Sequence, residues 1–131
     1  MSVAVRPFLM FEGRAEEAMT LYVSLIPGST VLEVERYGAG GPAKEGTIKQ
    51  ARFSIAGQVV QCSDSFVKHA FTFTPSFSFM VECESEAQQD MLWAALIEGG
   101  AAMMPLDNYG FSRRFGWLSD RFGVSWQLNL P

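Results

Sequence analysis

Hydrophobic positions follow two different periods along this chain, and the same order of periods occurs twice. Helical spacing predicts one helix over residues 14–26 and a second over 85–98. The first is followed by Pro27-Gly28 and the second by Gly99-Gly100, which are typical helix stops. The apolar positions that define the two helical faces are Ala15, Ala18, Met19, Tyr22, Leu25 and Ile26, and then Met91, Leu92, Ala95 and Leu96.

Strand periodicity fills the remaining segments. The clearest case is 71–82, where every second residue is apolar while Thr72, Thr74, Ser76 and Ser78 occupy the other side. This is the period of a strand with one face in a core. Turn residues such as Gly57 separate the other strands. The predicted strands are 3–11, 30–37, 48–56 and 58–63 in the first half, and 71–82, 101–105, 111–118 and 124–130 in the second.

The two halves are related by weak internal repetition. A shift of 71 residues places Leu21-Tyr22-x-x-Leu25-Ile26-x-Gly28 on Leu92-Trp93-x-x-Leu96-Ile97-x-Gly99. A shift of 66 places Gly57-x-x-x-Gln61 on Gly123-x-x-x-Gln127. We therefore predict one α+β domain over 1–131, built from two βαβββ modules at about 1–66 and 70–131, with mixed sheets that curve around a concave cavity. The alternative is that the polar strand faces simply contact water.

Composition narrows the class of partner. The chain has 131 residues, 48% hydrophobic and 18% charged, which is typical of a folded domain with a real core. Its net charge of −4 and the absence of Lys or Arg clusters argue against nucleic acid. No apolar run has the length of a bilayer, and no signal peptide is recognisable, so we expect a cytoplasmic protein without a membrane partner. Cys62 and Cys83 are expected in the core rather than in a disulfide.

Three sequence stretches resemble the PhnB-like branch of the vicinal oxygen chelate superfamily, which includes glyoxalase I, extradiol dioxygenases and bleomycin-binding proteins. They are 7–18 (PFLMFEGRAEEA), 79–83 (FMVEC) with Asp90 and Trp93, and 116–127 (GWLSDRFGVSWQ). The resemblance implies a glyoxalase-like fold. It also implies a homodimer, because the superfamily commonly forms its cavities within or across paired modules. Members of this branch often carry the description demethylubiquinone methyltransferase.

Active members of the superfamily hold a divalent metal with four strand residues, usually His and Glu. The corresponding positions here resemble Pro7, Gln61, Ser76 and Gln127. None is a carboxylate, thiolate or imidazole, which zinc, iron and nickel prefer. The only histidine, His69, lies between the two modules. We therefore predict no metal site and no cofactor.

Six residues are candidates for ligand binding. Gln61, Gln127 and Ser76 lie on the predicted polar faces, where amide and hydroxyl groups can bind a carbonyl or hydroxyl. Arg113 and Arg114 are adjacent in an aromatic strand, so alternation directs one of them to the cavity side, where it would bind a carboxylate or phosphonate. Trp117 would form an apolar floor. The competing interpretations are a hydrogen bond between sheets for the glutamines, a solvated arginine, and core packing for the tryptophan.

The sequence favours a metal-free protein that binds a small molecule in a concave cavity. The first alternative is an enzyme that acts on a small organic substrate with a weakly bound divalent metal. Methyl transfer is disfavoured, because the Gly38–Gly41 stretch lacks the strand, glycine turn and helix context of the usual S-adenosylmethionine site.

Overall fold

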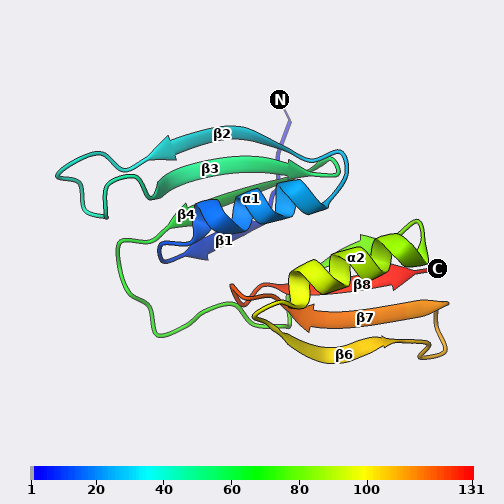
Figure 1. Cartoon of the computed structure of the whole chain (residues 1–131). Coiled ribbons are helices and arrows are strands. Elements are labelled where there is room, and N and C mark those ends of the chain that lie inside the picture. Colours follow the sequence, from blue (N-terminus) through cyan, green and yellow to red (C-terminus); the bar gives the residue numbers. More distant parts are fainter. Residues whose placement is uncertain (1) are drawn as a thin grey trace. The chain divides into compact units, whose positions relative to one another are not determined.

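The computed structural model describes residues 2–131, and these form two compact units, residues 2–69 and Ala70–Pro131. Each unit has one helix and four strands in the order βαβββ (Figure 1). The N-terminal unit contains β1 (Phe8–Phe11), α1 (Ala15–Leu25), β2 (Thr30–Arg36), β3 (Ile48–Ile55) and β4 (Gln58–Asp64). The C-terminal unit contains β5 (Ser78–Glu82), α2 (Glu86–Ile97), β6 (Ala101–Asp107), β7 (Arg114–Ser119) and β8 (Ser125–Leu130).

Both sheets have the same topology. The strand order is β1-β4-β3-β2 in the N-terminal unit and β5-β8-β7-β6 in the C-terminal unit. In each, the first strand pairs in parallel with the last, and the other pairs are antiparallel. The predicted α+β class and the two βαβββ modules are therefore confirmed. The helix of each unit lies along one face of its own sheet, and the opposite face of that sheet is here called the open face (Figure 1).

The core of each unit lies between the helix and the sheet. Residues at alternating positions of the central strands are fully buried on that side, including Phe53, Val60 and Cys62 in the N-terminal unit. Tyr22 of α1 is also fully buried, and its ring centroid lies 6.4 Å from that of Phe53. Both cysteines are buried and free. Burial of this apolar surface drives the pairing of helix and sheet.

A buried carboxylate fixes the start of helix α1. Asp64, at the end of β4, is 2% exposed. One of its oxygens accepts hydrogen bonds from the backbone N–H groups of Gly13 (2.8 Å) and Ala15 (2.9 Å), and the other accepts from Ile48 (2.9 Å). The side chain thus satisfies donors at the α1 N-terminus that lack partners within the helix. It also links α1 to strands β3 and β4.

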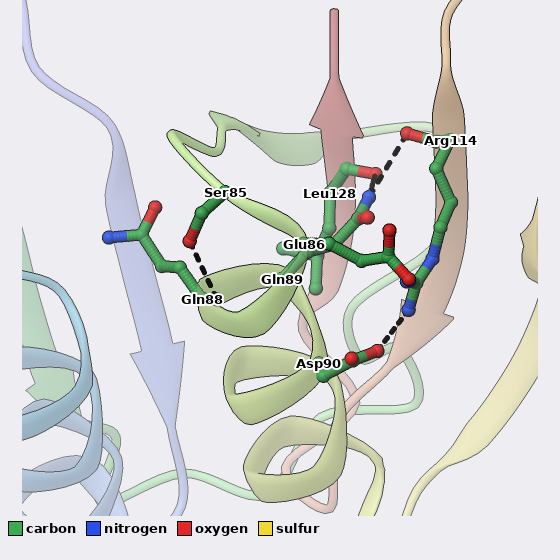
Figure 2. A network of polar contacts seen from close by, with 7 residues as sticks. All are labelled: Ser85, Glu86, Gln88, Gln89, Asp90, Arg114 and Leu128. Carbon is green, nitrogen blue, oxygen red and sulfur yellow. Dashed lines mark hydrogen bonds and ion pairs between the residues drawn. The ribbon is translucent and has the colours of Figure 1, made fainter.

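The C-terminal unit attaches its helix differently. Ser85 caps α2, because its side chain accepts from Gln88 N at 3.1 Å. The fully buried Gln89 donates from Nε2 to the carbonyls of Arg114 and Leu128, on adjacent strands (Figure 2). In this unit a side-chain amide from the helix therefore links helix to sheet, whereas in the other unit the link is a carboxylate from a strand.

Two predicted strands are much shorter than expected. Residues 71–77 alternate in polarity but lie outside β5, which begins at Ser78. The parallel partner β8 begins at Ser125, opposite Ser78, so earlier residues have no neighbouring strand to pair with. Residues 3–7 likewise precede β1, and Val3 and Val5 are 91% and 88% exposed. Pro7 has no backbone N–H to donate to a sheet.

Candidate functional site

The surroundings of Gly116 show which face of the C-terminal sheet contacts the helix. A Cβ atom on Gly116 would lie 2.6 Å from Trp93 of α2, so this position faces the helix. Because side chains alternate along a strand, Phe115 and Trp117 point to the open face. The register then places four residues side by side across that face, one from each strand. This row, here called the Trp117 row, is Met80, Gln127, Trp117 and Met104.

Hydrogen bonds hold the centre of the Trp117 row in place. The Trp117 indole Nε1 donates to Ser125 Oγ at 2.8 Å, and the Ser125 and Ser78 hydroxyl oxygens lie 2.6 Å apart. Gln127 Nε2 donates to Ser78 Oγ at 3.3 Å. The side-chain oxygen of Gln127, Oε1, accepts no hydrogen bond from the rest of residues 2–131. The network leaves an oriented amide acceptor beside an indole ring and the half-exposed Met80.

The N-terminal sheet has the equivalent row with different chemistry. Phe8, Gln61, Arg52 and Glu33 are aligned by register across β1, β4, β3 and β2, and are here called the Arg52 row. The Arg52 guanidinium donates to Glu33 at 2.8 Å, and Gln50 Nε2 donates to the other Glu33 oxygen at 2.9 Å. The hydrogen bond from Arg52 lowers the pKa of Glu33, and the same contact raises the pKa of Arg52. This row is charged where the other is aromatic.

The candidate residues from the sequence occupy different environments. Gln61 and Gln127 lie at matching positions, each in the middle of an open-face row. Trp117 is adjacent to Gln127, and Ser76 lies in the turn before β5, with its hydroxyl 2.8 Å from that of Thr74. Ser78 is therefore the β5 hydroxyl that reaches Gln127. The 71-residue shift that relates the helices maps Pro7 onto Ser78 and would have identified it.

Neither candidate arginine lies in an open-face row. Arg114 faces the helix, where its guanidinium contacts the carboxylates of Glu86 (2.8 Å) and Asp90 (Figure 2). Arg113 precedes β7 and donates to the backbone carbonyl of Pro131 at 2.9 and 3.0 Å. The arginine that does lie beside an open-face glutamine is Arg52, which pairs with Gln61 across β3 and β4. Sequence alternation alone did not single it out, because Arg52 sits in a strand of mixed polarity.

The donor set at the superfamily's metal positions does not suit a tightly held transition metal. Gln61 and Gln127 offer neutral amide oxygens, Ser78 a neutral hydroxyl, and Pro7 no side-chain donor. Zinc and iron are held by imidazole, thiolate or carboxylate. Within residues 2–131, no group of three or more His, Cys, Asp or Glu side chains is close enough to share a metal ion.

These features define the class of protein. Two βαβββ units, each with an open mixed sheet and a helix on one face, are the fold of the vicinal oxygen chelate superfamily, to which glyoxalase-like proteins belong. More specifically, the chain belongs to the family described as 3-demethylubiquinone-9 3-methyltransferase, whose model matches residues 3–129. The resemblance read from the sequence is confirmed.

Solved structures support the same assignment. The PhnB protein from Bacillus cereus is 50% identical, with a TM-score of 0.95 over 98% of this chain and 100% of that one. Protein PA1353 from Pseudomonas aeruginosa is 30% identical, with a TM-score of 0.84 over 98% of each chain. The fosfomycin resistance protein FosX from Listeria monocytogenes, a mutant of which was solved with Mn(II) and a phosphonic acid, is 13% identical, with a TM-score of 0.63 over 98% of this chain and 92% of that one. That last likeness concerns the fold alone.

The search of curated proteins found no match. Neither helix within residues 2–131 combines the length and apolar character needed to cross a bilayer.

Proposed function

We propose that this protein binds a small, ring-containing organic molecule on the open face of its C-terminal unit, without a resident transition metal. The observation that carries the proposal is the Trp117 row. An indole ring, two thioethers and an oriented amide lie side by side on a face that no helix of the unit covers. Binding sites for small molecules typically combine apolar and aromatic surface with a few fixed polar groups.

The hydrogen bonds behind the row support recognition rather than simple packing. Ser78 and Ser125 fix both the Trp117 indole and the Gln127 amide, so neither side chain has to be ordered when a ligand binds. The unpaired Gln127 carbonyl oxygen would accept from a hydroxyl or N–H group of the ligand. Thioether side chains contact aromatic rings favourably and adapt to their shape.

Titration with anilinonaphthalene sulfonate, an amphipathic fluorescent probe, tests the proposal. We expect saturable binding that Trp117→Ala weakens about tenfold, because one aromatic contact and its buried area are lost. Gln127→Ala should weaken it by a smaller factor, whereas Gln58→Ala, at the exposed start of β4, should leave it unchanged. Equal affinity for the wild type and Trp117→Ala, with both folded, would sink the proposal.

Two measurements address the other functions. Metal analysis of the purified protein should find no stoichiometric transition metal, and a bound ion lost on Gln127→Ala would favour the metal-dependent enzyme. Calorimetric titration with S-adenosylmethionine tests the methyl transfer in the family description, and we expect no saturable heat. A homodimer is expected from the superfamily, and a sedimentation profile with only monomer would contradict it.

A further inference from the structure

A second row crosses the same open face, two residues further along each central strand. The register aligns Asp107 of β6, Phe115 of β7, Asn129 of β8 and Glu82 of β5. The Asn129 Nδ2 group donates to Glu82 Oε2 at 3.0 Å, so these two side chains lie on the same side of the sheet. We call these four residues the Glu82 row. Two residues along a strand correspond to roughly 7 Å from the Trp117 row.

Three aromatic rings gather at this end of the unit. Phe111, from the turn between β6 and β7, meets the Phe115 ring edge-on with centroids 5.0 Å apart. Tyr109 stacks on Phe111 at 6.4 Å and lies edge-on to Phe115 at 6.3 Å. Phe115 is buried, but Phe111 is 64% and Tyr109 39% exposed. A fixed, exposed aromatic surface therefore adjoins the Phe115 and Asp107 end of the Glu82 row. Tyr109 is held by donating from Oη to the Pro105 carbonyl.

The polar groups of this row are acceptors. Glu82 is an exposed carboxylate, and Asp107 places a second one at the opposite end. The Asn129 Oδ1 atom is buried and accepts no hydrogen bond within the described chain. No Lys or Arg occupies any of the four aligned positions. The two arginines nearest in sequence donate to the Pro131 carbonyl and to the carboxylates of α2.

We propose that the Glu82 row and the rings of Tyr109 and Phe111 bind an organic cation, a quaternary or protonated amine. Aromatic faces attract such cations through their quadrupole, and a carboxylate supplies the balancing charge. The proposal rests on the proposed function, since it assigns a cationic group to a ligand whose ring would contact the Trp117 row. Charge complementarity carries it, because the four aligned positions at this end of the face are acidic, amide or aromatic, and the nearby Arg113 guanidinium is held on the Pro131 carbonyl.

Choline and its uncharged isostere dimethylbutanol are the matched probes. Backbone amide shifts of isotopically labelled, full-length protein should report saturable binding of choline, centred on residues near Asp107 and Phe111, and no binding of dimethylbutanol. Asp107→Asn should weaken choline about tenfold, because Asp107 pairs with Phe115 and is the carboxylate beside the rings. Glu82→Gln should weaken it less, because Glu82 lies two strands away from Phe115. Phe111→Ala should weaken it about fivefold, the size of a partly exposed cation–π contact.

Two control variants match these changes elsewhere on the chain. Glu45→Gln removes the same charge from an exposed loop, and Phe66→Ala removes a ring that is 59% exposed. Both should bind choline as the wild type does. Equal binding of the two probes, no binding of choline, or the same weakening in Glu45→Gln as in Asp107→Asn would each overturn the proposal.

The two proposals fail separately. If anilinonaphthalene sulfonate binding depends on Trp117 while choline does not bind, the cation site is wrong and the proposed function stands. If neither probe binds saturably, both are wrong.

Discussion

Replacing Asp64 tests how helix α1 is held on the sheet of the N-terminal unit. Asp64 is 2% exposed, and its carboxylate accepts three backbone hydrogen bonds of 2.8–2.9 Å. Asp64→Asn would keep one acceptor oxygen, best placed between Gly13 and Ala15, and would turn its NH₂ group toward the Ile48 N–H. One hydrogen bond would then be replaced by two donors that face each other.

The magnitude follows from the bonds that are lost. A hydrogen bond to a charged acceptor is worth about 1.5–3 kcal/mol, and the two that remain in Asp64→Asn would lose their charge assistance. We expect the free energy of unfolding of the N-terminal unit to fall by about 3 kcal/mol, and by about 4–5 kcal/mol in Asp64→Ala, which leaves three buried donors unpaired. This is a large fraction of the stability of a typical domain.

Native-state amide exchange of α1 and β3, together with urea unfolding, would measure the effect. Protection of those amides should fall about a hundredfold in Asp64→Asn, since 1.4 kcal/mol is a factor of ten. Glu45→Gln carries the same charge change on an exposed residue and should stay within about 0.5 kcal/mol of the wild type. If Asp64→Asn matched that control, the carboxylate would not be the link between α1 and the sheet.

Three further predictions concern the helix side of the sheets. Gly116→Ala should cost about 1–3 kcal/mol in urea unfolding, because its Cβ would lie 2.6 Å from the Trp93 ring, and unchanged stability would contradict the assigned face. Burial, together with the nearby Asp64 charge, raises the pKa of the Cys62 thiol to about 12, so it should resist alkylation at neutral pH in the folded protein. Its contribution to stability is full below pH 9, the ordinary thiol value, and is lost as the pH rises from about 9 to 12, so Cys62→Ala should unfold less steeply with alkali. Arg114→Met should cost about 1 kcal/mol, because it loses exposed partners on α2, and should leave probe binding on the Trp117 row unchanged.

The local sequence pattern was sufficient to predict the helices and strands, but not to predict which strand residues pair with a neighbouring strand. Both helices and all eight strands were predicted in the observed order, because apolar period and turn residues act within short segments. The alternation at 71–77 was misleading, because a strand exists only where another strand supplies hydrogen bonds, and β8 begins too late to do so. Sequence carries no direct signal of where a partner strand begins.

The candidate site depended on register in the same way. Ser76 and Ser78 are equally polar and share a strand period, yet only Ser78 contacts Gln127. Alternation predicts that one of Arg113 and Arg114 points to the cavity side, but Arg114 faces the helix and Arg113 precedes the strand. Gln61 and Gln127 were identified because the repeat marks them, whereas Arg52 matches Trp117 only through strand pairing.

The two units differ at the helix–sheet contact and on the open face, and the two kinds of difference have different causes. At the helix–sheet contact the changes compensate in volume. Tyr22 of α1 corresponds to the larger Trp93, while Ala51 of β3 corresponds to Gly116, whose missing Cβ makes room for the indole. Close packing enforces such paired changes, because added volume on one side must be removed from the other. The open faces show no such compensation, since Arg52 and Glu33 stand where the other unit has Trp117 and Met104. Positions that are free of the core are therefore charged in one unit and apolar in the other, around a glutamine that both units share. This is the pattern expected where a ligand, rather than packing, selects the residue.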